Sequence, residues 1–348
     1  MPGLEHGTSG PQSPAFTTRA PVVLNAGLIP PEAEAHMRLA WDMRQVAARM
    51  VKVHELRDVF IAGEGLVFDR NLAVVPGSGT QHSPAEVEAG RQAVAVARAA
   101  GKLAPQAGRT LLCLKRGAGN YGHWLAEMLP LAFLWLGVLQ AGTCWVLAPA
   151  PGGPLGQVVP ESLDLMGVPA EQVRSAYGRP QWFEHLILAE GLTWHGTYLS
   201  PLVITALDWL ARDVLPGPHR RVWVSRAGAI RTLAGEAGLC RMLATKGWTI
   251  AQPGGMRLRD QIGLFKGARQ IAGVAGAGLA NLAFARPPAR VTAFVPANMC
   301  DTFFWLLSEL RGHDYTDVRC ALAGPATGIS PWDGTLSLPL PSILSCLA

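Results

Sequence analysis

Two glycine-rich segments hold the residues best suited to chemistry, and the first is GNYGHWLAEMLP at residues 119–130. Its His123 and Glu127 are four positions apart, so they share one face of a helix. An imidazole can accept a proton near neutral pH, and a carboxylate beside it orients the ring and raises its basicity. The spacing therefore predicts a general base. The alternative is that His123 only hydrogen-bonds the loop at a helix start and that Glu127 is solvated.

The second segment is QIAGVAGAGLAN at residues 270–281, an apolar strand that runs through a glycine turn into an apolar helix. Gly276 and Gly278 let a ligand approach the backbone closely. The unpaired N–H groups and partial positive charge of a helix N-terminus favour a phosphate there. The alternative is close packing of the strand against the helix, with no ligand.

The position of this turn argues against a nicotinamide oxidoreductase. The dinucleotide fingerprint follows the first strand of its domain, ends in glycine and has an acidic residue about 20 positions further on. Here the turn follows the third strand of its series, and Asn281 replaces the last glycine. The strand after the turn ends at residues 295–298 without an acid.

Two arginines, Arg226 and Arg231, flank a strand-to-helix loop at the same predicted sheet edge. Arginine suits bidentate recognition of phosphate. The pair therefore supports an anion site beside the glycine turn, although one of the two could be an ordinary solvated loop residue.

Alternating strands and helices must position these segments. Strands at residues 110–114 and 143–147 enclose a helix at residues 123–139. A second series runs from a strand at residues 221–225 to one at residues 291–295. This alternation predicts parallel sheets and an α/β fold class.

The remaining segments complete the predicted domain organisation. Apolar spacing predicts a surface helix over residues 38–56, and a capping box opens another helix at residues 83–100. The predicted divisions are a disordered tail (1–20), an N-terminal α/β domain (21–205), a C-terminal Rossmann-like domain (206–312) and a wrapping tail (313–348).

The composition indicates a folded protein with a sizeable core, because 49% of its 348 residues are hydrophobic and 16% are charged. The net charge is +5 without any run of Lys or Arg, which suits an anionic small ligand or a mildly anionic membrane surface and argues against nucleic acid. Six cysteines without metal-ligand spacing favour a reducing compartment. The most apolar stretch, residues 124–149, is interrupted by Glu127 and Pro130, so it predicts a buried helix and strand rather than a membrane span.

Three segments resemble the family 61 glycosyltransferases. They are GNYGHWLAEMLP, VWVSR with the helix that follows it, and RLRDQIGLFKGARQIAGVAGAGLANLAFARPPARVTAFVP. Their order and spacing agree with the family over roughly residues 109–315. The last segment is long and specific.

The resemblance implies a GT-B-like fold, in which two Rossmann-like domains with irregular N- and C-terminal extensions face a cleft. It implies a nucleotide-sugar donor held mainly by the C-terminal domain, with the N-terminal domain on the acceptor side. It also implies inversion at the anomeric carbon and no metal or other cofactor. The expected enzyme is a cytoplasmic hexosyl- or pentosyltransferase for a polysaccharide or glycolipid acceptor, as in capsule or exopolysaccharide biosynthesis. Peripheral contact with the inner face of the membrane and assembly into a homo-oligomer stay open.

The resemblance also assigns roles to residues of this chain. The candidate base is His123, with Asn120 and Glu127 near it. The donor site comprises Arg226, Glu236, Gln261, Gly276, Ala277, Gly278 and Asn281. Arg226 and the turn would hold the diphosphate, Asn281 would orient the donor, and Gln261 would cap the helix that leads toward the site.

Three positions depart from the family pattern. The histidine before the family's GAGL is Ala275 here, the asparagine of its NE pair is Gly235, and the glycine of its PGA turn is Pro288. Ala275 removes an imidazole expected near the donor. The alternative function is therefore a catalytically silent binding or assembly subunit that keeps the fold.

Overall fold

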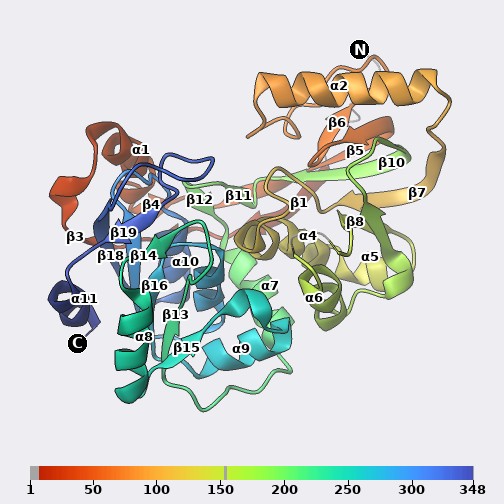
Figure 1. The fold of residues 1–348 in the computed structure, drawn as a ribbon. Coiled ribbons are helices and arrows are strands. Elements are labelled where there is room, and N and C mark those ends of the chain that lie inside the picture. Colours follow the sequence, from red (N-terminus) through yellow and green to blue (C-terminus); the bar gives the residue numbers. More distant parts are fainter. Residues whose placement is uncertain (1–7, 153–154, 348) are drawn as a thin grey trace. The chain divides into compact units, whose positions relative to one another are not determined.

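The computed structural model describes residues 8–152 and 155–347, and the chain divides into two compact units (Figure 1). The first unit is Met1–Ser13 with Arg49–Thr193, and the second is Pro14–Ala48 with Trp194–Ala348. Helices and sheets occur in both units, which confirms the expected α/β class. None of the helices in the described ranges combines the length and apolar character needed to cross a bilayer.

One mixed sheet organises the first unit, in the order β1-β5-β10-β7-β8-β9 with β6 paired to β5. Its strands are β1 (Thr8–Ser13), β5 (Arg49–Ala62), β6 (Leu66–Phe68), β7 (Pro105–Leu112), β8 (Trp145–Pro149), β9 (Val173–Ala176) and β10 (Gln181–Glu190). The strands β7 to β10 run parallel, whereas β1, β6 and β10 pair antiparallel with β5. The expected Rossmann-like sheet is therefore extended by an antiparallel part, because the short turn between β5 and β6 can join only antiparallel strands.

The helix α2 (Pro84–Ala99) packs on β5 and β6 of this sheet (Figure 1). It begins with the predicted capping box: Ser83 Oγ accepts from the Glu86 N–H at 3.2 Å, and Glu86 Oε2 accepts from the Ser83 N–H at 2.7 Å. Val94 from the helix joins Phe68 from the sheet in one buried cluster.

The single helix predicted for residues 123–139 is divided in the structure. It consists of α3 (Tyr121–His123), a π-helical turn (Trp124–Met128), α4 (Leu129–Leu134) and α5 (Leu136–Gln140). Pro130 explains the π-helical turn, since it has no N–H to donate to the carbonyl four residues earlier. The N–H of Leu129 donates instead to the carbonyl of Trp124, five residues back. Such π-helical turns are frequent at functional sites.

The second unit contains a largely parallel sheet in the order β14-β19-β18-β17-β16-β13-β15, with β3 paired to β18. Its strands are β3 (Val22–Leu24), β13 (Arg221–Val224), β14 (Thr232–Leu233), β15 (Thr249–Ala251), β16 (Gln270–Val274), β17 (Arg290–Pro296), β18 (Asp314–Leu322) and β19 (Thr335–Ser337). The strands from β15 to β18 are all parallel. They are connected through α8 (Glu236–Thr245), α9 (Leu258–Gly267), η5 (Ala277–Phe284) and α10 (Phe303–Arg311). The predicted alternating series is therefore present.

The strand order fixes where this sheet can bind a ligand. From β13 the chain crosses to β15 on one side and then returns past β13 to β16 on the other side. The switch point thus lies between the carboxyl ends of β13 and β16, which is where open α/β sheets hold their ligands.

Two sequence predictions fail in the N-terminal part. Residues 8–20 are not a disordered tail, because β1 pairs with β5 and β2 (Phe16–Thr17) pairs with β4 (Gln45–Val46); the rest of that tail, residues 1–7, lies outside the described residues. The surface helix predicted for residues 38–56 is also wrong. The helix α1 (Pro31–Trp41) ends early, and β5 begins at Arg49 because its pairing with β10 overrides the local helical spacing.

The predicted domain boundaries also change. The chain passes into the second unit at Trp194 rather than at residue 206, and residues 21–48 belong to that unit instead of the N-terminal domain. Buried Arg319 explains this association, because its Nη2 lies 2.9 Å from Met37 Sδ and 2.7 Å from Asp317 Oδ2. The expected wrapping tail contributes β18, an interior strand of the sheet, and α11 (Leu340–Leu347), whose apolar side chains join the core.

Candidate active site

Arg226 and Gly276 lie at the switch point of the second unit, each two residues after the end of its strand. The backbone N–H of Arg226 donates to Glu236 Oε1 at 3.0 Å, and its Nε donates to the carbonyl of Arg231 at 3.1 Å. Burial, and secondarily the charge of Arg231, lower the pKa of the guanidinium. Within the described part of the chain, no carboxylate forms an ion pair with Arg226. The charges of Glu236 and Asp333 act in the opposite direction and raise the pKa, but neither carboxylate pairs with the guanidinium. The fold thus holds a largely buried cation that can bind a further anion.

Gly276 makes room for that cation. A Cβ placed on Gly276 would lie 2.2 Å from Arg226 Nη1, so the guanidinium rests directly on the backbone of the turn. The φ angle of Gly276 is 173°, which is extended backbone, so the glycine is needed for space and not for an unusual conformation. The turn then opens η5, with Ala277 and Gly278 partly exposed at its start.

Arg231 ties this loop to two other segments. Its Nη1 donates to the carbonyl of Ala275 at 2.8 Å, and its Nε donates to Asp333 Oδ1 at 3.2 Å. The sequence singled out Arg231 as a loop residue, but it gave no signal for Asp333, which lies in the C-terminal segment without a clear period. The end of β16, the Arg226 loop and that segment are therefore joined around one guanidinium.

Glu236 acts on the site through the backbone. Its side chain is buried, and Oε1 accepts both from Trp223 Nε1 at 3.0 Å and from the Arg226 N–H at 3.0 Å. The carboxylate at the first position of α8 thus fixes the carboxyl end of β13 and the direction in which Arg226 leaves it.

Gln261 and Asn281 hold each other rather than facing solvent. Asn281 Nδ2 donates to Gln261 Oε1 at 2.9 Å and to the carbonyl of Gly278 at 3.0 Å, and Gln261 Nε2 donates to the carbonyl of Met256 at 3.1 Å. Their exposed fractions are 0% for Asn281 and 2% for Gln261. The geometry therefore supports a positioning role, in which the two amides fasten the glycine turn to α9.

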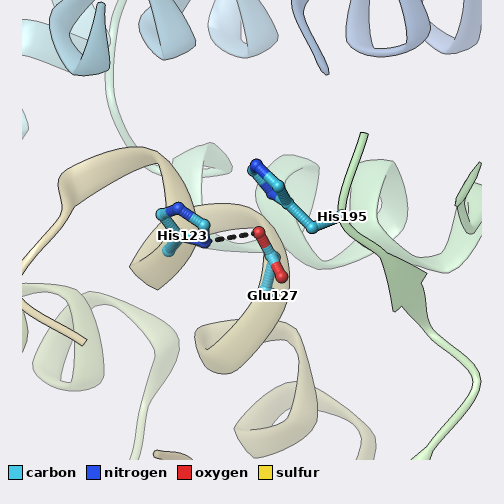
Figure 2. A group of neighbouring side chains, drawn as sticks. All are labelled: His123, Glu127 and His195. Carbon is cyan, nitrogen blue, oxygen red and sulfur yellow. Dashed lines mark ion pairs between the residues drawn. The ribbon is translucent and has the colours of Figure 1, made fainter. Parts of the chain in front are cut away.

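A second group of polar side chains lies in the first unit around Glu127. Figure 2 shows His123 and Glu127 pointing toward each other from successive turns, with Nδ1 of His123 2.7 Å from Oε1 of Glu127. Oε2 of the same carboxylate pairs with Lys115 Nζ and accepts from Thr193 Oγ1 at 3.5 Å. The Glu127 side chain is 1% exposed, so the alternative of a solvated Glu127 is wrong; the His123 side chain retains 20%.

The glycine-rich loop before α3 positions His123. Asn120 Oδ1 accepts from the Gly122 N–H at 2.9 Å, so Asn120 is the N-cap of this helix. Gly117 has a φ of +86°, and a Cβ on it would lie 3.0 Å from the imidazole of His123. The ring therefore packs on bare backbone, which explains why a glycine precedes it.

The sheet topology explains why these groups meet. The chain order β7, β8, β9, β10 becomes the spatial order β10-β7-β8-β9, so the switch point of the first unit lies between β7 and β10. Lys115 follows β7 and Thr193 follows β10. Sequence reasoning missed both residues; Lys115 could have been found, because it directly follows the strand predicted at residues 110–114.

The pair formed by His123 and Glu127 can act as a base. When Nδ1 carries its proton toward the carboxylate, the lone pair of Nε2 can accept a proton from a hydroxyl. The buried carboxylate then stabilises the imidazolium that forms. The contact between Nδ1 and the carboxylate favours the tautomer in which Nδ1 carries the proton.

The family model Glycosyltransferase 61 matches residues 121–292. This stretch is just under half of the chain, and it supports a family 61 glycosyltransferase. It includes His123 and Glu127 of the first unit as well as Arg226 and Gly276 of the second. No protein of the curated collection matched this sequence.

The Glycosyltransferase 61 match leaves out two of the residues that complete these sites. Lys115 precedes the matched stretch, and Asp333 follows it. Both are charged partners of residues inside the match, namely Glu127 and Arg231. The two candidate sites of this protein therefore depend on flanking segments as well.

Proposed function

We propose that this glycosyltransferase is an inverting, metal-independent enzyme that moves a hexose or pentose from a nucleotide-sugar donor to a saccharide or lipid-linked saccharide acceptor. The observation that carries the proposal is the largely buried Arg226 guanidinium, which lies on the Gly276 backbone at the switch point and forms no ion pair with any described carboxylate. A diphosphate would pair with this guanidinium through charge-assisted hydrogen bonds. The Glycosyltransferase 61 match supports the transfer of a sugar.

The proposed reaction uses the two candidate sites in one step. The acceptor oxygen forms a bond to the anomeric carbon while the bond from that carbon to the donor phosphate breaks, which inverts the configuration. His123 Nε2 takes the proton of the acceptor hydroxyl, and Glu127 stabilises the resulting imidazolium. Arg226 stabilises the charge on the departing diphosphate. A GT-B-like arrangement, in which one unit supplies the base and the other the donor site, is part of the proposal.

Two protein charges support a mechanism that needs no metal. The guanidinium of Arg226 is one, and the N-terminus of η5 beside Gly276 is the other. Together they offset the charge that a divalent cation neutralises in metal-dependent transferases.

The proposal extends to the place of action. We place the enzyme in the cytoplasm, in contact with the inner face of the membrane, where it would act in the biosynthesis of capsule or other exopolysaccharide. The excess of arginine supports contact with anionic lipid or with an anionic donor. Assembly into a homo-oligomer is compatible with this role.

The test is a thermal-stability titration with UDP-, GDP-, CMP- and TDP-sugars, with and without EDTA. A ligand that binds only the folded state adds about 2.7 kcal/mol of stability at a concentration of 100 times its Kd. We expect one nucleotide-sugar to raise Tm equally with and without EDTA, and Arg226→Ala to abolish the rise. An EDTA-sensitive rise would overturn the metal-free mechanism.

Ala275 favours a second candidate function, a catalytically silent binding or assembly subunit. The family 61 glycosyltransferases carry a histidine at this position. The Ala275 side chain is fully buried, and its carbonyl accepts a hydrogen bond from Arg231. A silent subunit would show no turnover of any nucleotide-sugar, and Ala275→His would be the variant in which to look for restored activity. Intact His123 and Glu127 favour the active enzyme.

A further inference from the structure

A row of basic side chains lies at the amino ends of the parallel strands in the second unit. Arg220 and Arg221 lie at the beginning of β13, and Lys246 lies between α8 and β15. Arg269 and Arg286 precede β16 and β17. All five residues are exposed, and we call the surface that they form the amino-end face.

Hydrogen bonds show that these residues are neighbours. Arg221 Nη1 donates to the carbonyl of Lys246 at 3.2 Å, and the carbonyl of Arg220 accepts from the Arg269 N–H at 2.8 Å. Arg269 Nη1 donates to the carbonyl of Arg286 at 2.8 Å. Because neighbouring strands lie about 4.8 Å apart, the row from β15 to β17 is about 15 Å long.

The positive charge of the amino-end face is not offset by the protein. Among the residues that the structure describes, no carboxylate forms an ion pair with any member of the row. Asp208, Asp213 and Asp314 lie at the same end of the unit, but each pairs with an arginine outside the row. The face therefore attracts an anionic partner.

Capping of helix ends accounts for only part of this arrangement. The carboxyl ends of α8 and α9 favour nearby cations, and Arg220 Nη1 donates to the carbonyl of Gly267 at 3.4 Å. A guanidinium has five N–H donors, however. The arginines of the row can therefore cap the helices and still bind phosphate groups of a partner.

Apolar side chains are exposed beside the row. In the loop at residues 213–219, which joins α7 (Pro201–Ala211) to β13, Leu215 is 85% exposed. Lys266 Nζ donates to the carbonyl of Val214 at 2.6 Å and so holds this loop against α9. Trp209, in the last turn of α7, is 40% exposed. A soluble polyanion would leave these side chains in water, whereas a lipid surface would bury them.

We propose that the amino-end face binds an anionic lipid surface, with its arginines on the headgroup phosphates and Leu215 at the boundary of the acyl chains. Anionic headgroups supply the complementary charge, and an indole such as that of Trp209 favours the interface between lipid and water. The inference rests on the proposed function for the place of action, contact with a membrane, and it names the surface that makes this contact.

The proposed orientation keeps the donor site accessible from water. Arg221 begins β13, and Arg226 lies five residues further along, beyond the other end of the strand. At about 3.3 Å per residue the two ends are about 17 Å apart. Lipid binding and donor binding should therefore be independent, so each can be measured without the other.

The test is cosedimentation of the full chain with vesicles of phosphatidylcholine, alone or mixed equally with phosphatidylglycerol. We expect binding to the mixed vesicles only. Arg221→Gln combined with Lys246→Gln should weaken it about 25-fold, because each basic residue near an anionic surface contributes about a factor of five. Lys102→Gln combined with Arg179→Gln removes the same charge from exposed positions of the first unit and should change binding less than about twofold.

A second pair of variants tests the apolar contact. Leu215→Ser should weaken vesicle binding at least about threefold, and Val96→Ser, at an exposed position of α2, should leave it unchanged. If Leu215→Ser had no effect and alginate, a soluble acidic polysaccharide, bound to the same row, the partner would be an acidic polymer and not a lipid.

The remaining outcomes separate this inference from the proposed function. Equal binding of the wild type and of the Arg221 and Lys246 double variant to mixed vesicles would overturn the inference and keep the membrane contact. No binding of the wild type to mixed vesicles would overturn both the inference and the proposed place of action. Calorimetry with the nucleotide-sugar donor, expected to give one Kd for all these variants, tests the transferase proposal separately.

Discussion

Arg226 carries its positive charge largely out of water and forms no ion pair with a described carboxylate, and this burial has a consequence for stability. Removing the side chain relieves an unfavourable burial of charge, while it also removes the hydrogen bond from Nε to the carbonyl of Arg231. We expect Arg226→Ala to change the free energy of unfolding by less than about 1 kcal/mol while weakening donor binding about 10- to 100-fold.

Arg221 is the matched control for this measurement. It occupies the opposite end of β13, is exposed, and donates to the carbonyl of Lys246. Arg221→Ala should leave donor affinity unchanged. Equal losses of affinity in the two variants would show that general electrostatic attraction, and not the switch-point site, accounts for binding.

Glu127 should matter for turnover more than for donor binding. Glu127→Gln keeps the shape of the side chain but removes the charge that stabilises the imidazolium of His123. We expect kcat to fall by about 10²- to 10⁴-fold, the range for loss of general-base assistance, with donor Kd changed less than about threefold. Steady-state kinetics with calorimetry checks this. If Glu127→Gln kept the wild-type kcat, the pair formed by His123 and Glu127 would not be the general base.

At the scale of elements, two glycines at the end of β16 allow an effect on donor binding to be distinguished from an effect on packing. A Cβ at Gly276 collides with Arg226, whereas one at Gly273 within β16 would lie 2.6 Å from the carbonyl oxygen of Val224. Gly276→Ala should therefore displace the guanidinium and lower donor affinity at least about tenfold. Gly273→Ala should destabilise the fold by about 2 kcal/mol, because backbone cannot yield easily. Urea unfolding and calorimetry on both variants check this, and a reversed pattern would contradict the geometry.

His313 makes the stability of the second unit depend on pH. It is fully buried between α10 and β18; its Nδ1 accepts from the Ala289 N–H, and Nε2 contacts the carbonyl of Leu282. Burial lowers its pKa from 6.5 to about 4. The unfolded chain therefore binds a proton first, so stability is complete above pH 6.5 and falls toward pH 4, by about 3 kcal/mol in the limit.

The check is chemical unfolding between pH 7.5 and about 4. His313→Gln should be less stable at neutral pH but lose less on acidification than the wild type. The exposed His36 provides the control, and His36→Gln should follow the wild-type curve. An unchanged pH dependence in His313→Gln would show that other groups dominate acid unfolding.

The sequence was informative where local signals and tertiary contacts agree. The capping box at Ser83, the alternating series after Arg221 and the spacing of His123 and Glu127 depend on residues close together in the chain, and all three appear in the structure. β5 was mistaken for a helix because its partner β10 lies more than a hundred residues away. Asp333 could not be found, since only folding brings it to Arg231.

At the scale of the whole molecule, the second unit is built from two separate stretches of chain. Residues 14–48 contribute β3 to its sheet and Met37 and Trp41 to the surroundings of buried Arg319. A chain of residues 194–348 alone would expose the ion pair between Arg319 and Asp317 and the edge of β18. We expect it to unfold at a lower urea concentration than the same unit in the intact protein.

Adding a peptide of residues 14–48 should restore stability by mass action, with a gain that grows with peptide concentration. A peptide carrying Met37→Asp should restore less, because it places a charge at a fully buried position. If the fragment were as stable alone as in the intact chain, residues 14–48 would be only an attachment to this unit.

The most direct measurement is the release of nucleoside diphosphate from each nucleotide-sugar by purified protein in EDTA, compared with Glu127→Gln and Arg226→Ala. The account predicts turnover of one donor by the wild type, at least slow hydrolysis without acceptor, with strong losses in both variants. Turnover only with a divalent cation would contradict the metal-independent mechanism. Tight donor binding without turnover, with acceptor saccharides present, would contradict the proposal of an active enzyme. It would support the alternative of a catalytically silent binding subunit.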